Sequence, residues 1–258
     1  MLRLTIIFLV FMAIVFMYAN VAKAQLVKDG LVAYWPLDKN TIDGKKVKDV
    51  IGGNDGTMNA SLKIVAGKVG DALEFNGVTD KVDIPGTDAL DFNGKEKFSV
   101  SAWIYAKGTS GGTCCGSIVA QRDVNAWALR WDNRDGPREV EFIVCPGWVG
   151  DGSNFGLTVP LEEWHLVTGV CTGKQLLMYL DDKKGEGAEI AFPGAVSGGG
   201  FATTIGGASD GYFNGIIDEA LIYNKALSDK EIAQNFQAKG MAVDPKSKLA
   251  ICWGELKK

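Results

Sequence analysis

The sequence predicts an all-β protein in which two antiparallel sheets pack face to face as a sandwich. Three observations carry this prediction. Glycine is abundant, with 33 residues among 258, and proline is scarce, with 7. Short apolar runs rich in β-branched and aromatic residues alternate with turn signals along the chain. A chain of this length buries a sizeable core without help, so a single domain is sufficient.

The strands are predicted where apolar side chains are dense enough to pack a pleated surface. In the run 98–105, apolar residues at even positions alternate with Ser99, Ser101 and Trp103. This alternation predicts one face in the core and one face half exposed to water. Trp127 and Trp131 are expected in the core. The predicted strands, in chain order, are 31–35, 72–75, 98–105, 117–121, 127–131, 140–144, 164–170, 175–180, 203–205 and 215–223.

After residue 24, only one segment of the sequence predicts a helix. Ser228, with Glu231 three residues later, forms a capping box, and Ile232, Ala233 and Phe236 supply a short apolar stripe. Turns are predicted where a glycine that accepts a positive φ follows Asn or Asp. These turn pairs are Asn76-Gly77, Asp135-Gly136 and Asp210-Gly211.

Residues 1–24 predict a cleaved signal peptide. Arg3 gives a basic start, residues 4–19 are almost wholly apolar, and Ala22 with Ala24 forms a small-residue cleavage site. The apolar run of 16 residues is shorter than the roughly 20 needed to cross a bilayer, so no membrane span is expected after cleavage. We therefore expect a secreted or cell-surface protein with one domain over 25–240 and a polar tail over 241–258.

The charge balance argues against nucleic acid as a partner. Lys and Arg number 27 against 31 Asp and Glu, and loss of the leader changes the net charge from -4 to -6 because Arg3 and Lys23 are removed. Phosphate binding requires a clustered basic surface, and the sequence shows no such cluster.

Five cysteines occur, and in an exported chain disulfides are expected. Their spacing fits no zinc pattern. Adjacent cysteines make poor geometry for a mutual bridge, so we expect Cys114 and Cys115 to pair elsewhere. The expected pairs join Cys145 to Cys114 or Cys115 and place Cys171 in a second bridge. One thiol is left over, either free or joined to another chain.

Several motifs are specific enough to point to a family. The closing segment 214–228 reads NGIIDEALIYNKALS, a strand that leads directly into the capped helix. Six earlier segments carry matching motifs: 30–38 (GLVAYWPLD), 53–57 (GNDGT), 73–82 (LEFNGVTDKV), 98–104 (FSVSAWI), 164–167 (WHLV) and 176–182 (LLMYLDD). On these motifs nearly the whole chain after the leader resembles the bacterial laminin-G-like, pentraxin-like jelly rolls of the concanavalin A-like superfamily.

The resemblance implies a two-sheet jelly-roll sandwich with loops at its rims. Relatives of this fold bind glycans, bind proteins or decorate larger secreted enzymes, and a fold does not fix a function. We expect a non-catalytic recognition or adhesion module whose partner is a glycan or an extracellular protein. The alternative is a carbohydrate-active enzyme of the glycoside hydrolase kind, or an accessory domain of one.

The enzyme alternative requires two positioned carboxylates, one to protonate the leaving oxygen and one to act as nucleophile or base. On one strand this means acidic residues at alternating positions. The sequence has no Glu-x-Asp-x-Glu or Glu-x-Asp-x-x-Glu motif. Glu139 and Glu141 share a strand face, but apolar residues form the opposite face, so solvated outward carboxylates are expected there.

Aromatic residues in loops favour the binding function. Sugars present apolar C–H faces that stack on aromatic rings. Trp148 and Phe155 lie in the Gly-rich stretch 146–160, where loops carry recognition residues, and are the candidate ligand contacts.

The resemblance also implies a calcium ion, because many members of the family hold one near the two ends of the chain. Calcium takes about 6 to 8 oxygen ligands and often mixes carboxylates with loop carbonyls. By resemblance the candidate ligands are Asp49, Asp80, Asp218 and Glu219. Lys81 beside Asp80 departs from such a site. For Asp218 and Glu219 a structural role as hydrogen-bond acceptors stays open.

Overall fold

Two antiparallel sheets make up the protein, as the sequence predicts. The computed structural model describes residues 24–108, 114–134, 140–152, 155–238 and 240. The predicted leader, apart from Ala24, and the tail 241–258 therefore lie outside the described residues. No helix in the described part of the chain has the length and apolarity needed to cross a bilayer.

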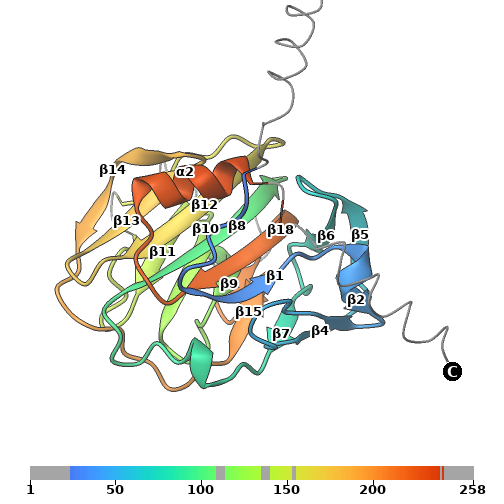
Figure 1. Ribbon diagram of the computed structural model, residues 1–258, viewed down its shortest axis with the longest axis horizontal. Helices are drawn as coiled ribbons and strands as arrows, with labels where there is room; N and C mark the ends of the chain where they lie inside the picture. The colour runs from blue at the N-terminus through green and yellow to red at the C-terminus, as the bar shows by residue number, and fades with distance from the viewer. Residues whose placement is uncertain (1–23, 109–113, 135–139, 153–154, 239, 241–258) are drawn as a thin grey trace, which may run out of the picture.

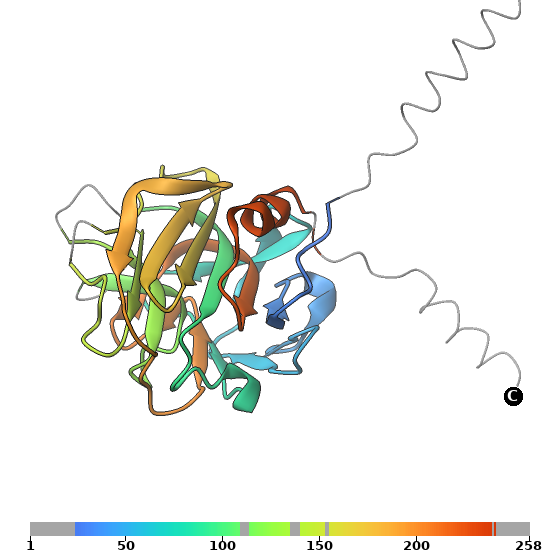
Figure 2. The ribbon, with the colours of Figure 1, turned by 60° about the vertical axis from the view of Figure 1, so that its left-hand side comes forward.

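The first sheet contains most of the long strands and carries β18 near its centre. Figure 1 shows α2 (Asp229–Gln237) lying across it. Figure 2 shows the helix nearly end-on, outside the sheet. In spatial order its strands are β14 (Lys183–Ala191), β13 (Gln175–Leu180), β12 (Trp164–Cys171), β8 (Phe98–Ala106), β18 (Asn214–Tyr223), β6 (Asp71–Asn76) and β5 (Lys63–Ala66), with β1 (Leu31–Trp35) also paired to β18.

The second sheet has shorter strands, and two small strands attach to it at β9. In spatial order it contains β11 (Val140–Val144), β10 (Trp127–Asp132), β9 (Cys115–Ala120), β15 (Thr203–Ile205), β7 (Val82–Ile84), β4 (Gly56–Met58), β3 (Lys46–Val47) and β2 (Ile42–Asp43), with β16 (Gly207–Ala208) and β17 (Gly211–Tyr212) beside β9. Single turns of 3-10 helix lie at Lys39–Thr41 and Asp88–Leu90.

The core fills the space between the sheets and is rich in aromatic rings. Phe98 of β8 and Phe142 of β11 meet across the sheets with ring centroids 5.5 Å apart. Burying one such side chain contributes about 1.5–3 kcal/mol. A Cβ at Gly169 of β12 would lie 2.4 Å from the Phe142 ring, so glycine is required there. Trp127 and Trp131 lie in this core, as expected.

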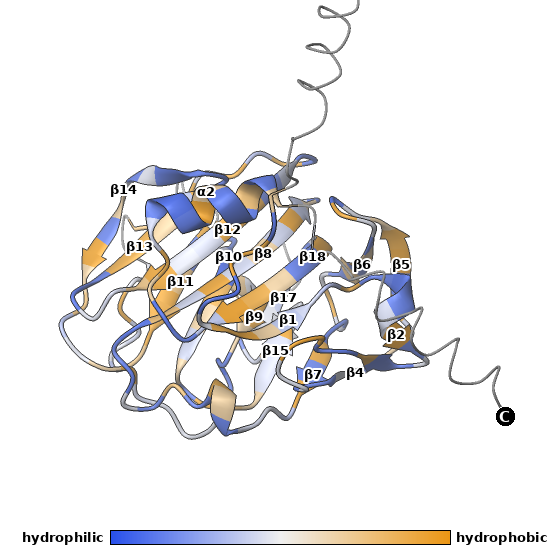
Figure 3. Ribbon diagram, in the orientation of Figure 1, coloured by the Kyte–Doolittle hydropathy of each residue, from blue (hydrophilic) through white to orange (hydrophobic). Residues whose placement is uncertain are grey.

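The outer face of the first sheet is covered, which corrects the expectation of a half-wet face. Ser99, Ser101 and Trp103 are at most 3% exposed. Ser99 Oγ donates to the Lys225 carbonyl at 2.8 Å and accepts from the Leu227 N–H at 2.9 Å, so the segment leading into α2 covers it. In Figure 3 hydrophilic residues occupy most of the helix ribbon, while the strands behind it are more hydrophobic.

Helix α2 begins as the capping box predicts. The Glu231 carboxylate accepts the Ser228 N–H at 2.9 Å. Asn235, which is 2% exposed, ties the helix to both neighbouring segments. Its Oδ1 accepts the Val27 N–H at 2.9 Å, and its Nδ2 donates to the Tyr223 hydroxyl at 3.0 Å. Asn235 therefore links α2 to the segment before β1 and to the last residue of β18.

The exposed sheet edges are short or charged. Strand β14 forms one edge of the first sheet and is mostly exposed, with a 2.6 Å ion pair between Lys184 and Glu189. Lys63 lies on β5 at the opposite edge and pairs with Glu74. In the second sheet, edge strand β2 has only two residues. The backbone of edge strand β11 is bridged by loop residues Val149 and Leu157.

Candidate functional site

A charged cluster occupies the outer face of strands β9, β10 and β11. Arg130 on β10 lies opposite Ser117 and Glu141 in the sheet register. Its guanidinium contacts Glu141 at 3.0 Å, Asp151 at 2.6 Å and Asp210 at 3.2 Å. The Arg130 side chain is only 2% exposed. A cation this deeply buried depends on its three carboxylate partners.

The cluster continues toward solvent through Arg134. Its guanidinium binds Asp132 at 2.7 Å and Asp151 at 2.6 Å. Burial alone would raise the pKa of Asp132, but hydrogen bonds from Arg134 outweigh it and lower that pKa. Burial raises the pKa of Glu141 to about 7 despite the attraction of Arg130. The charged cluster thus comprises Asp132, Glu141, Asp151, Asp210, Arg130 and Arg134.

The expectation of a solvated Glu141 was wrong. Glu141 does point away from the core, but it is 2% exposed because Arg130 lies beside it and the N–H of Gly152 donates to its Oε1 at 3.2 Å. The strand pattern showed the face correctly and could not show what covers it. Glu139 lies outside the described residues.

Trp148 lies at the end of this face where the charged cluster gives way to small apolar residues. Its indole packs near Ala120, Ala128 and Ile143, which form one row across the three strands. The guanidinium carbon of Arg122 lies 3.9 Å from the centre of the Trp148 ring. Trp148 is half-buried. The tryptophan and the arginine therefore form a platform at the rim of the sheet.

Phe155, the second predicted ligand contact, does not lie on this surface. It is 3% exposed and belongs to the main core. The Gly-rich stretch folds back over β11, and the N–H and carbonyl groups of Leu157 and Val140 bond to each other at 2.8 and 3.1 Å. The segment that carries Phe155 therefore closes the edge of the sandwich.

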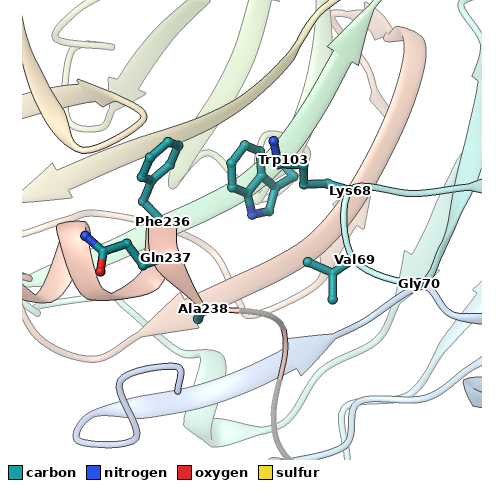
Figure 4. Close-up of a pocket in the computed structure, with 7 residues that line it drawn as sticks. All are labelled: Lys68, Val69, Gly70, Trp103, Phe236, Gln237 and Ala238. Atoms are coloured by element: carbon teal, nitrogen blue, oxygen red, sulfur yellow. The ribbon is translucent and has the colours of Figure 1, made fainter. Parts of the chain in front are cut away.

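A pocket of about 370 Å³ opens on the other sheet. Figure 4 shows Trp103 between Lys68 on one side and Phe236 on the other. The rings of Trp103 and Phe236 stack with centroids 5.4 Å apart, and the Lys68 ammonium lies 4.5 Å from the Trp103 ring centre. Val69 and Gly70 complete one wall. Gln237 and Ala238 line the opposite side.

Two of the predicted calcium ligands are engaged in local hydrogen bonds. Asp49 Oδ1 accepts the N–H groups of Tyr34, Ile51 and Gly52 at 2.9–3.0 Å, and its Oδ2 accepts two bonds from Asn54. Asp80 lies in the exposed turn at Asn76-Gly77, where its Oδ2 accepts the Asn76 N–H at 3.1 Å. Both carboxylates therefore stabilise turns.

Asp218 and Glu219 lie together on β18 and are buried. Both oxygens of Glu219 accept from the Tyr34 hydroxyl, at 2.8 and 2.7 Å. Asp49 accepts the backbone N–H of Tyr34, at the other end of that residue from its hydroxyl, so the length of the tyrosine separates Asp49 from Glu219. Asp218 Oδ2 accepts the Val69 N–H at 2.9 Å, and its Oδ1 is buried without a hydrogen-bond partner among the described residues.

The predicted set of four ligands is thus not brought to one place. Within the described residues there is no group of three or more His, Cys, Asp or Glu side chains placed to hold a metal ion. Burial raises the pKa of Asp218 to about 7 and that of Glu219 to about 8. The unpartnered Asp218 oxygen is the one feature here that suits a cation, and calcium binding stays a prediction.

The cysteine pairing differs from expectation. Cys114 and Cys115, which are neighbours in the chain, contact each other through their sulfur atoms, while Cys145 and Cys171 are free and buried. In the sheet register, Cys115 lies opposite Asp132, the last residue of β10. Cys145 directly follows Val144, which lies opposite Trp127, the first residue of β10. The length of β10, about 17–20 Å at roughly 3.3 Å per residue, separates them, which no disulfide spans. Cys252 lies outside the described residues.

Comparison with known proteins places the fold in a family. A family model described as Laminin_G_3, of the concanavalin A-like lectin/glucanases superfamily, matches residues 43–233. The chain belongs to this superfamily. The predicted resemblance and fold class are both confirmed. No curated protein sequence matches the concanavalin A-like chain.

Solved structures with the same fold share little sequence with this concanavalin A-like chain. Domain 4 of AbnA, a GH43 extracellular arabinanase from Geobacillus stearothermophilus, in complex with arabinotriose, is 19% identical, with a TM-score of 0.60 over 80% of this chain and 97% of that one. The binding domain of Botulinum Neurotoxin DC, in complex with SialylT, is 15% identical, with a TM-score of 0.58 over 81% and 51%. Trypanosoma rangeli sialidase is 16% identical, with a TM-score of 0.57 over 82% and 33%, so the chain spans about a third of that enzyme.

Proposed function

We propose that this concanavalin A-like domain is a secreted recognition module that binds carbohydrate at the platform of Trp148 and Arg122. The observation that carries the proposal is the half-buried indole of Trp148, held 3.9 Å from Arg122 at the rim of the charged cluster. The export part of the proposal rests on the leader-like sequence of residues 1–24.

The platform suits a sugar chemically. Because Arg122 covers one face of the Trp148 ring, a sugar packs its C–H groups against the exposed edge of the indole, while its hydroxyls hydrogen-bond to the charged side chains beside the ring. Arg122 offers guanidinium donors, and its Nε lies 3.4 Å from Asp210 Oδ2. Asp151 is a third exposed at its side chain, so it adds acceptor oxygens at the same rim.

The structural neighbours support a carbohydrate ligand over a protein ligand. The arabinanase domain was solved in complex with arabinotriose, and the neurotoxin binding domain was solved in complex with SialylT. Because sequence identity is below 20%, the likeness to these neighbours extends to the fold alone. The ligand must therefore be tested on this chain directly.

A glycan array followed by calorimetry on the best ligand tests the proposal. Trp148→Ala should weaken binding at least about tenfold, the scale of a central aromatic contact. Trp164→Ala is the matched control, because Trp164 is also partly buried and packs against Tyr105 on the other sheet. Wild-type affinity in Trp148→Ala, or an array with no bound glycan, would overturn the proposal.

The alternative of a carbohydrate-active enzyme has one observation in its favour. The pKa of Glu141 is raised to about 7 and that of its neighbour Asp132 is lowered, a separation typical of acid–base pairs. Against it, Glu141 is 2% exposed and ion-paired to Arg130, so its carboxyl group is not accessible to a substrate. Release of reducing ends from the glycans that bind on the array, abolished in Glu141→Gln, would favour the enzyme.

A further inference from the structure

The pocket at Trp103 lies on the opposite sheet from the Trp148 platform and has a rigid wall. The loop between β5 and β6 forms this wall, and Gly67 N–H donates to the Gly70 carbonyl at 2.9 Å to close the turn. The Val69 N–H in the same turn donates to Asp218 at 2.9 Å, which anchors it to β18. Lys68, at the tip of the turn, is thereby held beside the Trp103 ring.

Lys68 supplies an unused positive charge at the mouth of this pocket. Its side chain is exposed, and among the described residues it forms no ion pair with a carboxylate. An exposed ammonium on an aromatic ring is weakly held. The ammonium can therefore turn from the Trp103 ring toward an anionic ligand at little cost.

We propose that the Trp103 pocket binds an acidic sugar, with the carboxylate of a hexuronic acid on Lys68 and its ring against Phe236 and Trp103. The volume of about 370 Å³ lies at the small end of the range of about 300–1,000 Å³ for small-molecule sites, which suits one or two sugar rings. The aromatic wall provides a flat apolar surface, and Phe236 is partly exposed on it. This site is independent of the Trp148 platform.

Two carboxylates near the pocket, those of Asp218 and Glu219, are buried on β18 behind the turn that carries Val69. A third, Asp38, lies behind Gly70 of the wall, where a Cβ would come within 2.3 Å of its Oδ1. Lys68 is the charged side chain among the residues that line the pocket, and it is exposed.

Calorimetry at low salt, with the full chain, tests the site. The probes are methyl glucuronide and methyl glucoside, which share a ring and differ in the carboxylate. The uronide should bind at least about tenfold more tightly, as expected for one charge-assisted contact. Lys68→Met keeps the aliphatic stem and should remove this preference. Lys174→Met, an exposed lysine elsewhere, is the matched control and should retain it.

Three further arms separate the explanations. Phe236→Ala should weaken both glycosides, and Trp148→Ala should leave the uronide affinity unchanged. Circular dichroism checks that each variant is folded. Unchanged uronide binding in Lys68→Met, loss of it in Trp148→Ala, or no uronide binding at millimolar concentration would overturn the proposal. Acetate that competes as well as the uronide would overturn the sugar assignment and leave a simple carboxylate site.

Discussion

At the scale of single residues, Arg130 is the side chain on which the outer face of the second sheet depends. It is buried with Glu141 and Asp210, and removal of one partner from a buried charge pair leaves the other uncompensated. Arg130→Met should therefore lower the free energy of unfolding by about 3–5 kcal/mol. Urea unfolding monitored by fluorescence measures this value.

Arg134→Met is the control for this prediction. The Arg134 side chain is 41% exposed, and exposed ion pairs contribute about 0–1 kcal/mol. A loss below about 1 kcal/mol for Arg130→Met would show that the charged cluster reorganises or admits water.

Residue-level prediction from sequence succeeded where one strand holds the information. The core positions of Trp127 and Trp131 follow from alternation along β10. The burial of Glu141 does not follow, because its cover comes from Arg130 on the neighbouring strand and from Gly152 in a loop. Lys68 was missed for the same reason, since only the folded chain brings it over Trp103.

At the scale of elements, α2 stabilises the fold through Asn235 as well as through its apolar face. Asn235→Ala leaves the Val27 N–H without its acceptor and the Tyr223 hydroxyl without its donor. A buried polar group left unsatisfied costs about 1–3 kcal/mol, so the free energy of unfolding should fall by that amount. Chemical denaturation of the chain beginning at Gln25 provides the measurement.

The neighbouring Gln234 offers a matched control. Its side chain donates to the Gln25 carbonyl at 2.7 Å in an exposed setting, so Gln234→Ala should change stability by less than about 0.5 kcal/mol. Equal losses for the two variants would show that the Asn235 contacts are replaced by water.

The sequence predicted the longer buried strands well, and missed exposed strands and very short ones. The runs 140–144, 175–180 and 203–205 coincide with β11, β13 and β15. Strand β14 was missed because its sequence, KKGEGAEIA, is charged and glycine-rich, and only its pairing with β13 makes it a strand. The two-residue strands β2 and β3 are too short to show any alternation.

At the scale of the whole molecule, stability should depend on pH and calcium together. Burial raises the pKa of Asp218 to about 7 and that of Glu219 to about 8, above their ordinary values of 3.8 and 4.5. A carboxyl group whose pKa is higher in the folded than in the unfolded state stabilises the fold at pH values below its unfolded pKa. This stability is lost as the pH rises through its folded pKa. In chelator, the melting temperature should therefore fall between pH 5 and pH 8.

Calcium should reverse this loss if it binds the ionised Asp218. Because protons compete with the ion, the rise in melting temperature on adding calcium should be larger at pH 8 than at pH 5. The gain is about 2.7 kcal/mol at a hundredfold excess over Kd, and magnesium should not replace calcium. Asp218→Asn should remove the effect, while Asp43→Asn, on exposed β2, should not. Equal melting temperatures in chelator and in millimolar calcium at pH 8 would contradict the prediction.

The length, charge and loop cover of the edge strands decide whether copies of the domain pair with one another at high concentration. A long, flat, apolar edge strand offers unpaired N–H and C=O groups that recruit another chain and start aggregation. Here β14 carries Lys183, Lys184 and Glu189, β2 is only two residues long, and loop residues bridge β11. Each of these edges repels or blocks an incoming strand. At these three edges the domain is therefore protected against pairing with a neighbouring copy.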